Sequence, residues 1–336
     1  MKKTILVTTF ILFFTFIGFG KKLADLPELM KPSRVFFVDD TQIYIPEGAV
    51  INIYSKKNYK LIKKFGKSGE GPKEFRVVPQ LPLSIDAQGK NLVIFSLGKV
   101  SYFTKQGEFI KEIKTSSQVF SLMVYGDKFI GRSRKQDKSV VYDTINLYDS
   151  TLNKIKELAR NRSAFQGIGK GLEVLGKPFL HSVYKNKILL IGKDDATIDI
   201  FNGDMKKLRS IKLDGKKISM KQDFKDKVID LLKNGEATKS YFSIFKPIRF
   251  PDYFPIIAAF FVDNNVIYVL TWTKNPNEYG CSIFGIDGKF VKNVSIPIKF
   301  QDSLTPYPIA IHNGVLYQIV ENDEDEMWEL HASEIK

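Results

Sequence analysis

The chain has 336 residues, 43% of them hydrophobic and 26% charged, which excludes an intrinsically disordered protein. This length allows two ordinary domains or one large all-β domain. The formal net charge is +14, but the basic residues are spread along the chain without a recognition motif. We therefore expect no nucleic-acid partner, and either a solvated basic surface or an attraction to anionic lipids or polysaccharides.

The first twenty residues have the layout of a secretory signal peptide. Two lysines precede an uncharged apolar run over residues 5–19, and Gly18 and Gly20 supply small residues at the −3 and −1 positions of a cleavage site. The alternative is an uncleaved anchor, although the run is short for a bilayer of about 30 Å. We expect residues 1–20 to be removed and residues 21–33 to lead into the folded domain. The protein would then be exported to the periplasm or beyond, with no integral membrane segment.

The single cysteine, Cys281, lies in an alternating run that predicts burial. One cysteine cannot form an internal disulfide, and it cannot build a thiolate metal site. The stability of the exported protein must therefore come from packing.

From Arg34 onward a unit of four short strands recurs six times. Its second strand is an apolar run suited to burial on both faces, and its third strand alternates. Glycines lie at the turns, where a hairpin requires positive φ. A single unit cannot bury both of its faces, so the units stack around an axis. The pattern predicts one all-β domain over residues 34–336, a six-bladed β-propeller of four-stranded antiparallel blades, and we expect a monomer.

The segment of residues 218–255 interrupts the repeat between the fourth and fifth units. Within residues 218–236, Phe224, Val228 and Leu232 follow helical spacing, and Gly235 is a stop signal. These features predict a short amphipathic helix inserted between blades four and five.

The rest of this insertion, residues 239–255, is dense in aromatic and basic side chains. If they are exposed, they form a platform for sugar rings or for the apolar side chains of a protein partner. The alternative is that they pack the helix onto the propeller, and the exposure of Phe250 and Tyr253 decides between the two. The candidate ligand-binding residues are Tyr241, Phe245, Lys246, Arg249, Phe250 and Tyr253.

The stretch "KKFGKSGEGPKEF", residues 63–75, contains a Gly-Lys-Ser triplet but is not a phosphate-binding loop. Leu61 stands where such a loop requires glycine, and the residues after Ser68 cannot begin a helix. Instead, "FGKSGEGPKEF" resembles the Gly-x-x-Gly-x-Gly-Pro-x-x-Phe element that links blades in six-bladed, NHL-like propellers. The resemblance implies a propeller fold in an exported bacterial protein and says little about function. It implies structural roles for Gly66, Gly69, Gly71, Pro72 and Phe75, with Phe75 placed between the first two blades.

Two histidines and three aspartates are the candidates for a site at the central channel. His181 and His312 lie near inner-strand ends, where a pair of imidazoles could hold a metal ion. Asp39, Asp86 and Asp263 occupy turn positions from which oxygen ligands could bind Ca²⁺. The alternatives are satisfied polar residues at strand ends and ordinary turn chemistry. No cofactor is predicted apart from this Ca²⁺ alternative.

The sequence favours a non-catalytic binding or scaffold protein for a protein or glycan partner in the cell envelope. No nucleophile elbow, metalloprotease motif or Cys-x-x-Cys pair is present. The alternative is a hydrolase or lyase with its site at the channel mouth, dependent on a divalent cation.

Overall fold

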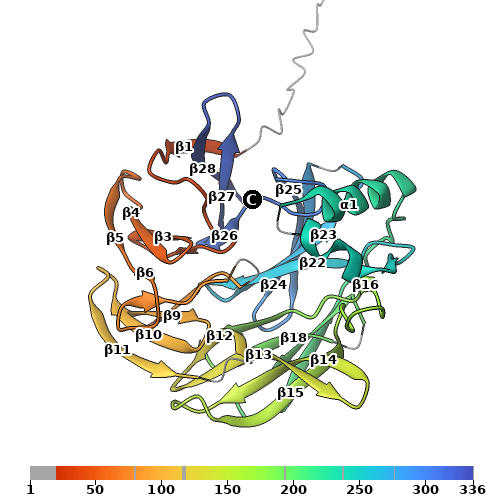
Figure 1. Ribbon diagram of the computed structural model, residues 1–336, viewed down its shortest axis with the longest axis horizontal. Coiled ribbons are helices and arrows are strands. Elements are labelled where there is room, and N and C mark those ends of the chain that lie inside the picture. Colours follow the sequence, from red (N-terminus) through yellow and green to blue (C-terminus); the bar gives the residue numbers. More distant parts are fainter. Residues whose placement is uncertain are drawn as a thin grey trace, which may run out of the picture.

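The computed structural model describes residues 20–78, 81–115, 119–192, 194–236, 238–275 and 277–335. The predicted signal segment lies outside the described residues except for Gly20. Six four-stranded antiparallel sheets surround a central axis, as Figure 1 shows. The fold is therefore the predicted all-β, six-bladed propeller, whereas the NHL-like subtype stays a prediction.

Each blade begins with an inner strand, because the first strands of neighbouring blades contact one another around the axis. Strands are given from the innermost to the outermost. Two blades are β2 (Phe37–Val38), β3 (Gln42–Glu47), β4 (Val50–Ser55), β5 (Leu61–Phe65) and β8 (Ser84–Gln88), β9 (Asn91–Ser96), β10 (Lys99–Thr104), β11 (Phe109–Lys114); the next two are β12 (Val119–Tyr125), β13 (Lys128–Asp137), β14 (Val140–Tyr148), β15 (Lys154–Arg162) and β17 (His181–Tyr184), β18 (Lys187–Ile191), β19 (Thr197–Phe201), β20 (Lys207–Lys212). The last two are β22 (Ile257–Asp263), β23 (Val266–Trp272), β24 (Glu278–Gly285), β25 (Phe290–Pro297) and β26 (Ile309–His312), β27 (Val315–Asn322), β28 (Met327–Glu334), β1 (Lys21–Asp25).

The last blade is closed by the beginning of the chain. Strand β1 pairs with β28 as the outermost strand of this blade, so Lys21–Asp25, the first five residues of the expected lead-in, belong to a sheet. Lys22 Nζ lies 2.8 Å from the buried Glu329 carboxylate, which also accepts from His331 Nε2 at 2.7 Å. Burial would raise the pKa of Glu329, but these two partners and Asn322 lower it to about 2.

This closure changes the count of the blades. In chain order, the blade that contains β1 and β26–β28 is the first, and the β2–β5 blade is the second. The helix α1 (Gln222–Asn234) therefore lies between the fifth blade, β17–β20, and the sixth, β22–β25. The expected position between blades four and five, counted from Arg34, is therefore corrected.

The hydrophobic core is divided among the six blade interfaces. Six buried clusters each combine side chains of two adjacent blades. The second strands supply much of each cluster: Ile43, Ile94, Leu189 and Val269 have essentially no exposed surface. Their burial on both faces explains why these strands are continuous apolar runs rather than alternating ones.

The antiparallel order gives the propeller two different faces. The turns after the first and the third strands of every blade lie on one face, which we call the hairpin face. The turns after the second strands and the links between blades lie on the other, which we call the insertion face, because it carries residues 218–255.

The glycine-rich linker runs from β5 to β8 on the insertion face. Strand β6 (Lys67–Ser68) pairs in parallel with β7 (Glu74–Phe75), and Phe75 is fully buried between the β2–β5 and β8–β11 blades, 5.9 Å from the Phe103 ring. Gly66 has φ +89°, and a Cβ there would meet the Phe75 ring at 2.5 Å. Lys73 also adopts a positive φ of 66°, which is uncommon for a residue other than glycine.

The insertion packs as a small layer beside the β22–β25 blade, and Figure 1 shows α1 there. Helix α1 ends at Gly235, whose N–H donates to the Leu231 carbonyl at 2.8 Å. A 3₁₀ helix, η1 (Lys239–Phe245), follows, and then β21 (Ile248–Arg249) pairs in parallel with β16 (Leu172–Glu173). Val228 and Leu232 anchor the helix against Val174.

Candidate functional site

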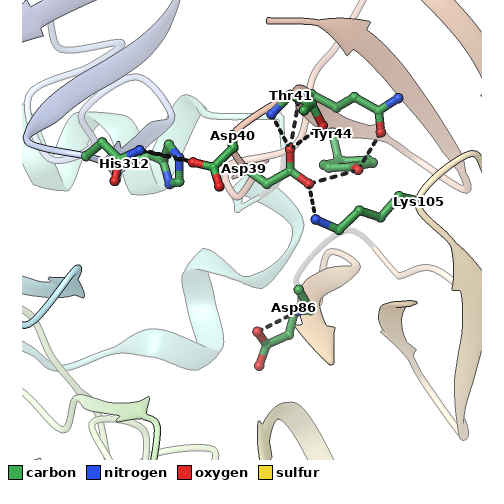
Figure 2. Close-up of polar contacts among 10 residues, drawn as sticks. Asp39, Asp40, Thr41, Tyr44, Asp86, Lys105 and His312 are labelled. Carbon is green, nitrogen blue, oxygen red and sulfur yellow. Dashed lines mark hydrogen bonds and ion pairs between the residues drawn. The ribbon is translucent and has the colours of Figure 1, made fainter. Parts of the chain in front are cut away.

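The predicted channel carboxylates lie at the hairpin face, and each of them already has partners. Asp39 accepts hydrogen bonds from the Thr41 and Gln42 backbone N–H groups at 2.7 and 2.8 Å, and lies 2.7 Å from Lys105 Nζ. Figure 2 shows Asp39 between Tyr44 and Lys105. Burial would raise the pKa of Asp39, but Lys105 and the two backbone donors outweigh it and lower the pKa.

His312 belongs to the same region and joins two blades. Its Nε2 lies 3.0 Å from Asp40 Oδ1, and its Nδ1 lies 3.7 Å from Asp263 Oδ1. Asp263 also accepts from the Asn313 backbone N–H at 2.6 Å. Figure 2 shows the contact of His312 with Asp40, and Asp263 lies on the other neighbouring blade, so the imidazole is held between carboxylates of two blades.

Equivalent contacts continue around the whole face and form what we call the inter-blade belt. Each blade meets the next through at least one polar contact at this level. The contacts are Asp40–His312, Asp263–Asn313, Tyr184–Asn265, Tyr125–Asn186, Asp86–Val124 and Asp39–Lys105. Asp39, Asp86 and Asp263 therefore serve blade-to-blade attachment in the structure.

His181 lies at the other end of the channel. It opens strand β17, whereas His312 closes strand β26, so the structure does not bring the two imidazoles together. Burial, and then the charge of Arg132, lower the pKa of His181 to about 3. Its Nε2 is buried without a hydrogen-bond partner among the described residues. His181 is therefore a neutral channel residue at physiological pH.

Within the part of the chain that the structure describes, no three His, Cys, Asp or Glu side chains are grouped so as to hold a metal ion. Over the same residues, no helix is both long and apolar enough to cross a membrane.

The predicted aromatic residues of the insertion divide into two groups. Phe245 and Phe250 pack in the cluster that holds α1, and Phe250 is not exposed. Tyr241 and Tyr253 are each 46% exposed. The test set by the sequence, the exposure of both Phe250 and Tyr253, is therefore met by Tyr253 alone.

The two predicted basic residues make local contacts. Arg249 donates to the Lys170 carbonyl at 3.0 Å, which ties the insertion to the loop before β16. Lys246 Nζ lies 4.9 Å from the centre of the Phe242 ring. Arg249 therefore has a structural partner at the base of the insertion.

Beside this segment, the structure shows a cleft of about 720 Å³ between the start of α1 and the β22–β25 blade. Its residues come from both ends of the insertion, from the turn between β23 and β24, and from the link after β25. The described residues that line it are Lys217, Ile218, Ser219, Lys221, Asp223, Phe224, Lys227, Phe254, Trp272, Thr273, Lys274, Asn275, Asn277, Glu278, Phe300, Asp302 and Ser303.

A continuous row of aromatic rings forms the wall of this cleft. Phe254 is central to it, with its ring centroid 4.8 Å from that of Phe224 and 4.7 Å from that of Trp272. Tyr279 lies beyond Trp272 at 5.4 Å and continues the row to Phe300 at 5.6 Å. The rings pack against one another in tilted and edge-to-face arrangements, which aromatic pairs prefer.

The rim of the cleft is polar and mixed in charge. Exposed lysines stand at the α1 side and at the β23–β24 turn, with Lys217 also 5.5 Å from the Tyr253 ring centre. Asp302 and Ser303 continue the rim into a shallow groove along α1 that reaches Asp226 and Asp230. The arrangement combines an apolar wall with hydrogen-bonding groups around it, which is typical of ligand sites.

None of the six candidate ligand-binding residues from the sequence lines this cleft, although Tyr253 borders it. The sequence feature that could have indicated this cleft is the segment "TWTKNPNE", residues 271–278, where a tryptophan precedes a polar turn. That turn follows a second strand, and second-strand turns share a face with the insertion.

No protein-family model matches the sequence, and no curated protein matches it. Among solved structures, a candidate exported protein of Bacteroides fragilis NCTC 9343 superposes with a TM-score of 0.56 at 13% identity, over 94% of both chains. A member of the DUF4221 family from Bacteroides vulgatus ATCC 8482 gives a TM-score of 0.52 at 12% identity, over 93% of this chain and 96% of that one. At such identities the likeness shows the propeller fold.

Proposed function

We propose that the protein is an exported, non-catalytic binding protein whose cleft between α1 and the β22–β25 blade takes a glycan. The observation that carries the proposal is the aromatic wall of Phe224, Phe254 and Trp272 inside a cleft of about 720 Å³. The apolar faces of sugar rings fit such a wall, and the cleft has the volume of a site for a small ligand.

The polar rim supports a sugar better than a purely apolar ligand. Asn275 and Asn277 supply amide donors and acceptors at one lip, and Asp223 and Asp302 supply acceptors at the other. Sugar hydroxyls donate and accept, so they satisfy both kinds of group. Export agrees with the signal-like residues 1–20 and with the candidate exported protein of similar fold.

The test is binding of three defined oligosaccharides, cellotetraose, chitotetraose and tetragalacturonate, followed by tryptophan fluorescence and calorimetry. The chain has two tryptophans, and Trp328 is buried in the cluster between the β2–β5 and β26–β28 blades. Emission changes on binding should therefore report Trp272. We expect at least one sugar to bind, and Trp272→Ala to weaken it by about tenfold or more.

Tyr241→Ala is the matched control, because Tyr241 is an exposed aromatic residue of the same insertion outside the cleft. It should leave the affinity unchanged. Asn275→Ala, which leaves the wall intact, should also weaken binding. If none of the sugars binds, or if Tyr241→Ala weakens binding as much as Trp272→Ala, the cleft is not a glycan site.

A further inference from the structure

The outermost strands share a feature that the propeller fold itself does not require. In five blades the register shifts at the second residue of the outer strand, so that this residue is the extra residue of a β-bulge. In every case it is an exposed aliphatic residue. The five are Ile62, Ile110, Ile155, Leu208 and Val291, with 44–58% of their surface exposed.

A bulge alone would protect these edges. It disrupts the row of free backbone groups to which another strand could add, and a polar residue in the bulge would serve equally well. What the five bulges share beyond edge protection is an aliphatic side chain at the same register position of each outer strand.

A basic residue follows each of the five aliphatic residues directly. They are Lys63, Lys111, Lys156, Arg209 and Lys292. The turn between the third and fourth strands of the β2–β5 blade, β4 and β5, carries three more lysines: Lys56, Lys57 and Lys60. We call the turn at this place in each blade its third turn. Asp149 and Asp287 in these turns accept hydrogen bonds from N–H groups of their own turns, whereas Glu108 forms an ion pair with Lys63 of the neighbouring blade.

All of these positions lie at the same end of the molecule. An outer strand begins where the third turn ends, so its second residue lies at the perimeter of the hairpin face. The five aliphatic–basic pairs thus form a ring around that face, which we call the perimeter ring.

The chain enters the fold at the same perimeter. Lys21 starts the outer strand β1, opposite Ala332, and the apolar run of residues 5–19 precedes it in sequence. Residues 20–21, where the described chain begins, therefore lie at the hairpin face, and the cleft lies on the insertion face.

We propose that the hairpin face docks flat on an anionic lipid bilayer. The aliphatic side chains of the perimeter ring reach the boundary between headgroups and acyl chains, and the adjacent basic side chains other than the ion-paired Lys63 contact lipid phosphates. Docking in this orientation holds the cleft away from the bilayer. The proposal does not depend on what the cleft binds.

The test uses protein that begins at Gly20, since every strand of the six sheets lies within Lys21–Glu334. Co-sedimentation with vesicles of phosphatidylcholine, alone or mixed with phosphatidylglycerol, measures partitioning. We expect binding to the mixed vesicles. Lys111→Glu with Arg209→Glu should weaken it by more than tenfold, and Ile110→Ser with Leu208→Ser should also weaken it.

The matched control is Lys233→Glu with Lys239→Glu, which makes the same change in net charge on the insertion face. It should weaken binding far less. If both charge reversals weaken binding equally, only net charge matters and the docking face is refuted. Absence of binding to the mixed vesicles also refutes it. Thermal unfolding of each variant checks that the fold is kept.

Orientation can be measured separately because the only cysteine is unreactive. Cys281 is 1% exposed, and burial raises its thiol pKa to about 12. A polarity-sensitive fluorophore on Ile155→Cys should shift to the blue on anionic vesicles. The same label on Gln301→Cys, at the insertion face, should not, and equal shifts at both positions would overturn the proposal.

Discussion

The hairpin face and the insertion face differ in how far their connections are constrained. Between β22 and β23 the hairpin face has only Asn264 and Asn265, and the Asn265 N–H donates to Tyr184 of the next blade at 2.9 Å. Between β20 and β22 the insertion face has the whole of residues 213–256. One face repeats a short turn, and the other carries links of very different length.

This difference follows from what each connection must contact. A hairpin turn lies against the neighbouring turn, so its polar groups are used in the inter-blade belt. A link between blades only has to reach the next inner strand, and extra residues cost little loop-closure entropy. New structure can therefore be added on the insertion face without disturbing the ring, and the cleft is found there.

Not every link on the insertion face is free of structural constraint, and Phe75 provides the test. Phe75 belongs to such a link but is fully buried between two blades. Phe75→Ala should lower the free energy of unfolding by about 3–5 kcal/mol, because it leaves a cavity beside Phe103. Urea or guanidinium unfolding measures the change.

Phe290→Ala is the control for the loss of a phenyl ring. Phe290 is 57% exposed at the start of β25, on the hairpin face. Its ring contacts only the rim of the core, with its centroid 5.7 Å from that of Phe284, so its replacement should lower the free energy of unfolding by about 1 kcal/mol or less. Equal losses in the two variants would mean that the linker does not hold the blades together.

His181 and its surroundings give a second, pH-dependent test at the insertion-face end of the channel. Burial and the charge of Arg132 lower the pKa of His181 to about 3, so the imidazole stays neutral in the native protein. In the unfolded chain the same imidazole takes up a proton below about pH 6.5. The free energy of unfolding should therefore fall as pH drops from 6.5 toward 3, by about 2 kcal/mol at pH 5 from this residue.

His181→Gln removes this proton uptake. Compared with the wild type, the variant should lose less stability between pH 7.5 and pH 5, as measured by urea unfolding at each pH. The two pH profiles should run parallel above pH 7, where His181 is neutral in both states. Parallel profiles down to pH 5 would show that His181 is hydrated in the native protein.

Most of the fold could be predicted because its signals are local. The apolar second strands, such as Ile43 to Ile45, and the glycine turns repeat in every blade, and the helix around Val228 has its own period. Strand β1 could not be predicted. "KKLAD" is short and charged, and it becomes a strand only through pairing with β28 at the other end of the chain.

The candidate site was harder to predict for the same reason. The aromatic density of residues 239–255 predicted a binding surface there. Composition does not distinguish Phe250, which packs in the cluster that holds α1, from Tyr253, which is exposed. The cleft needs Trp272 and Phe300, which lie outside the insertion and reach it only through the blade order. The metal and ligand roles of the candidate residues stay predictions.

Lys105 provides the smallest expected effect and tests the inter-blade belt. Its ammonium group lies 2.7 Å from Asp39 Oδ2 of the neighbouring blade, and both side chains are largely shielded from water. Lys105→Met should lower the free energy of unfolding by about 1 kcal/mol, since Asp39 keeps its backbone donors Thr41 and Gln42. The pKa of Asp39 should rise, so the stability that its ionised form contributes should be lost at a higher pH on acidification.

Lys289→Met is the matched control on the same face. Lys289 lies 3.5 Å from Asp287 within one turn, and both are well exposed, so the change should have almost no effect on stability. A difference between the two variants would show that contacts across blades, rather than charged turns in general, hold the hairpin face together. If Lys105→Met is as stable as Lys289→Met, the short turns of this face are maintained by their backbone hydrogen bonds alone, and the contrast between the two faces is one of loop length rather than of attachment.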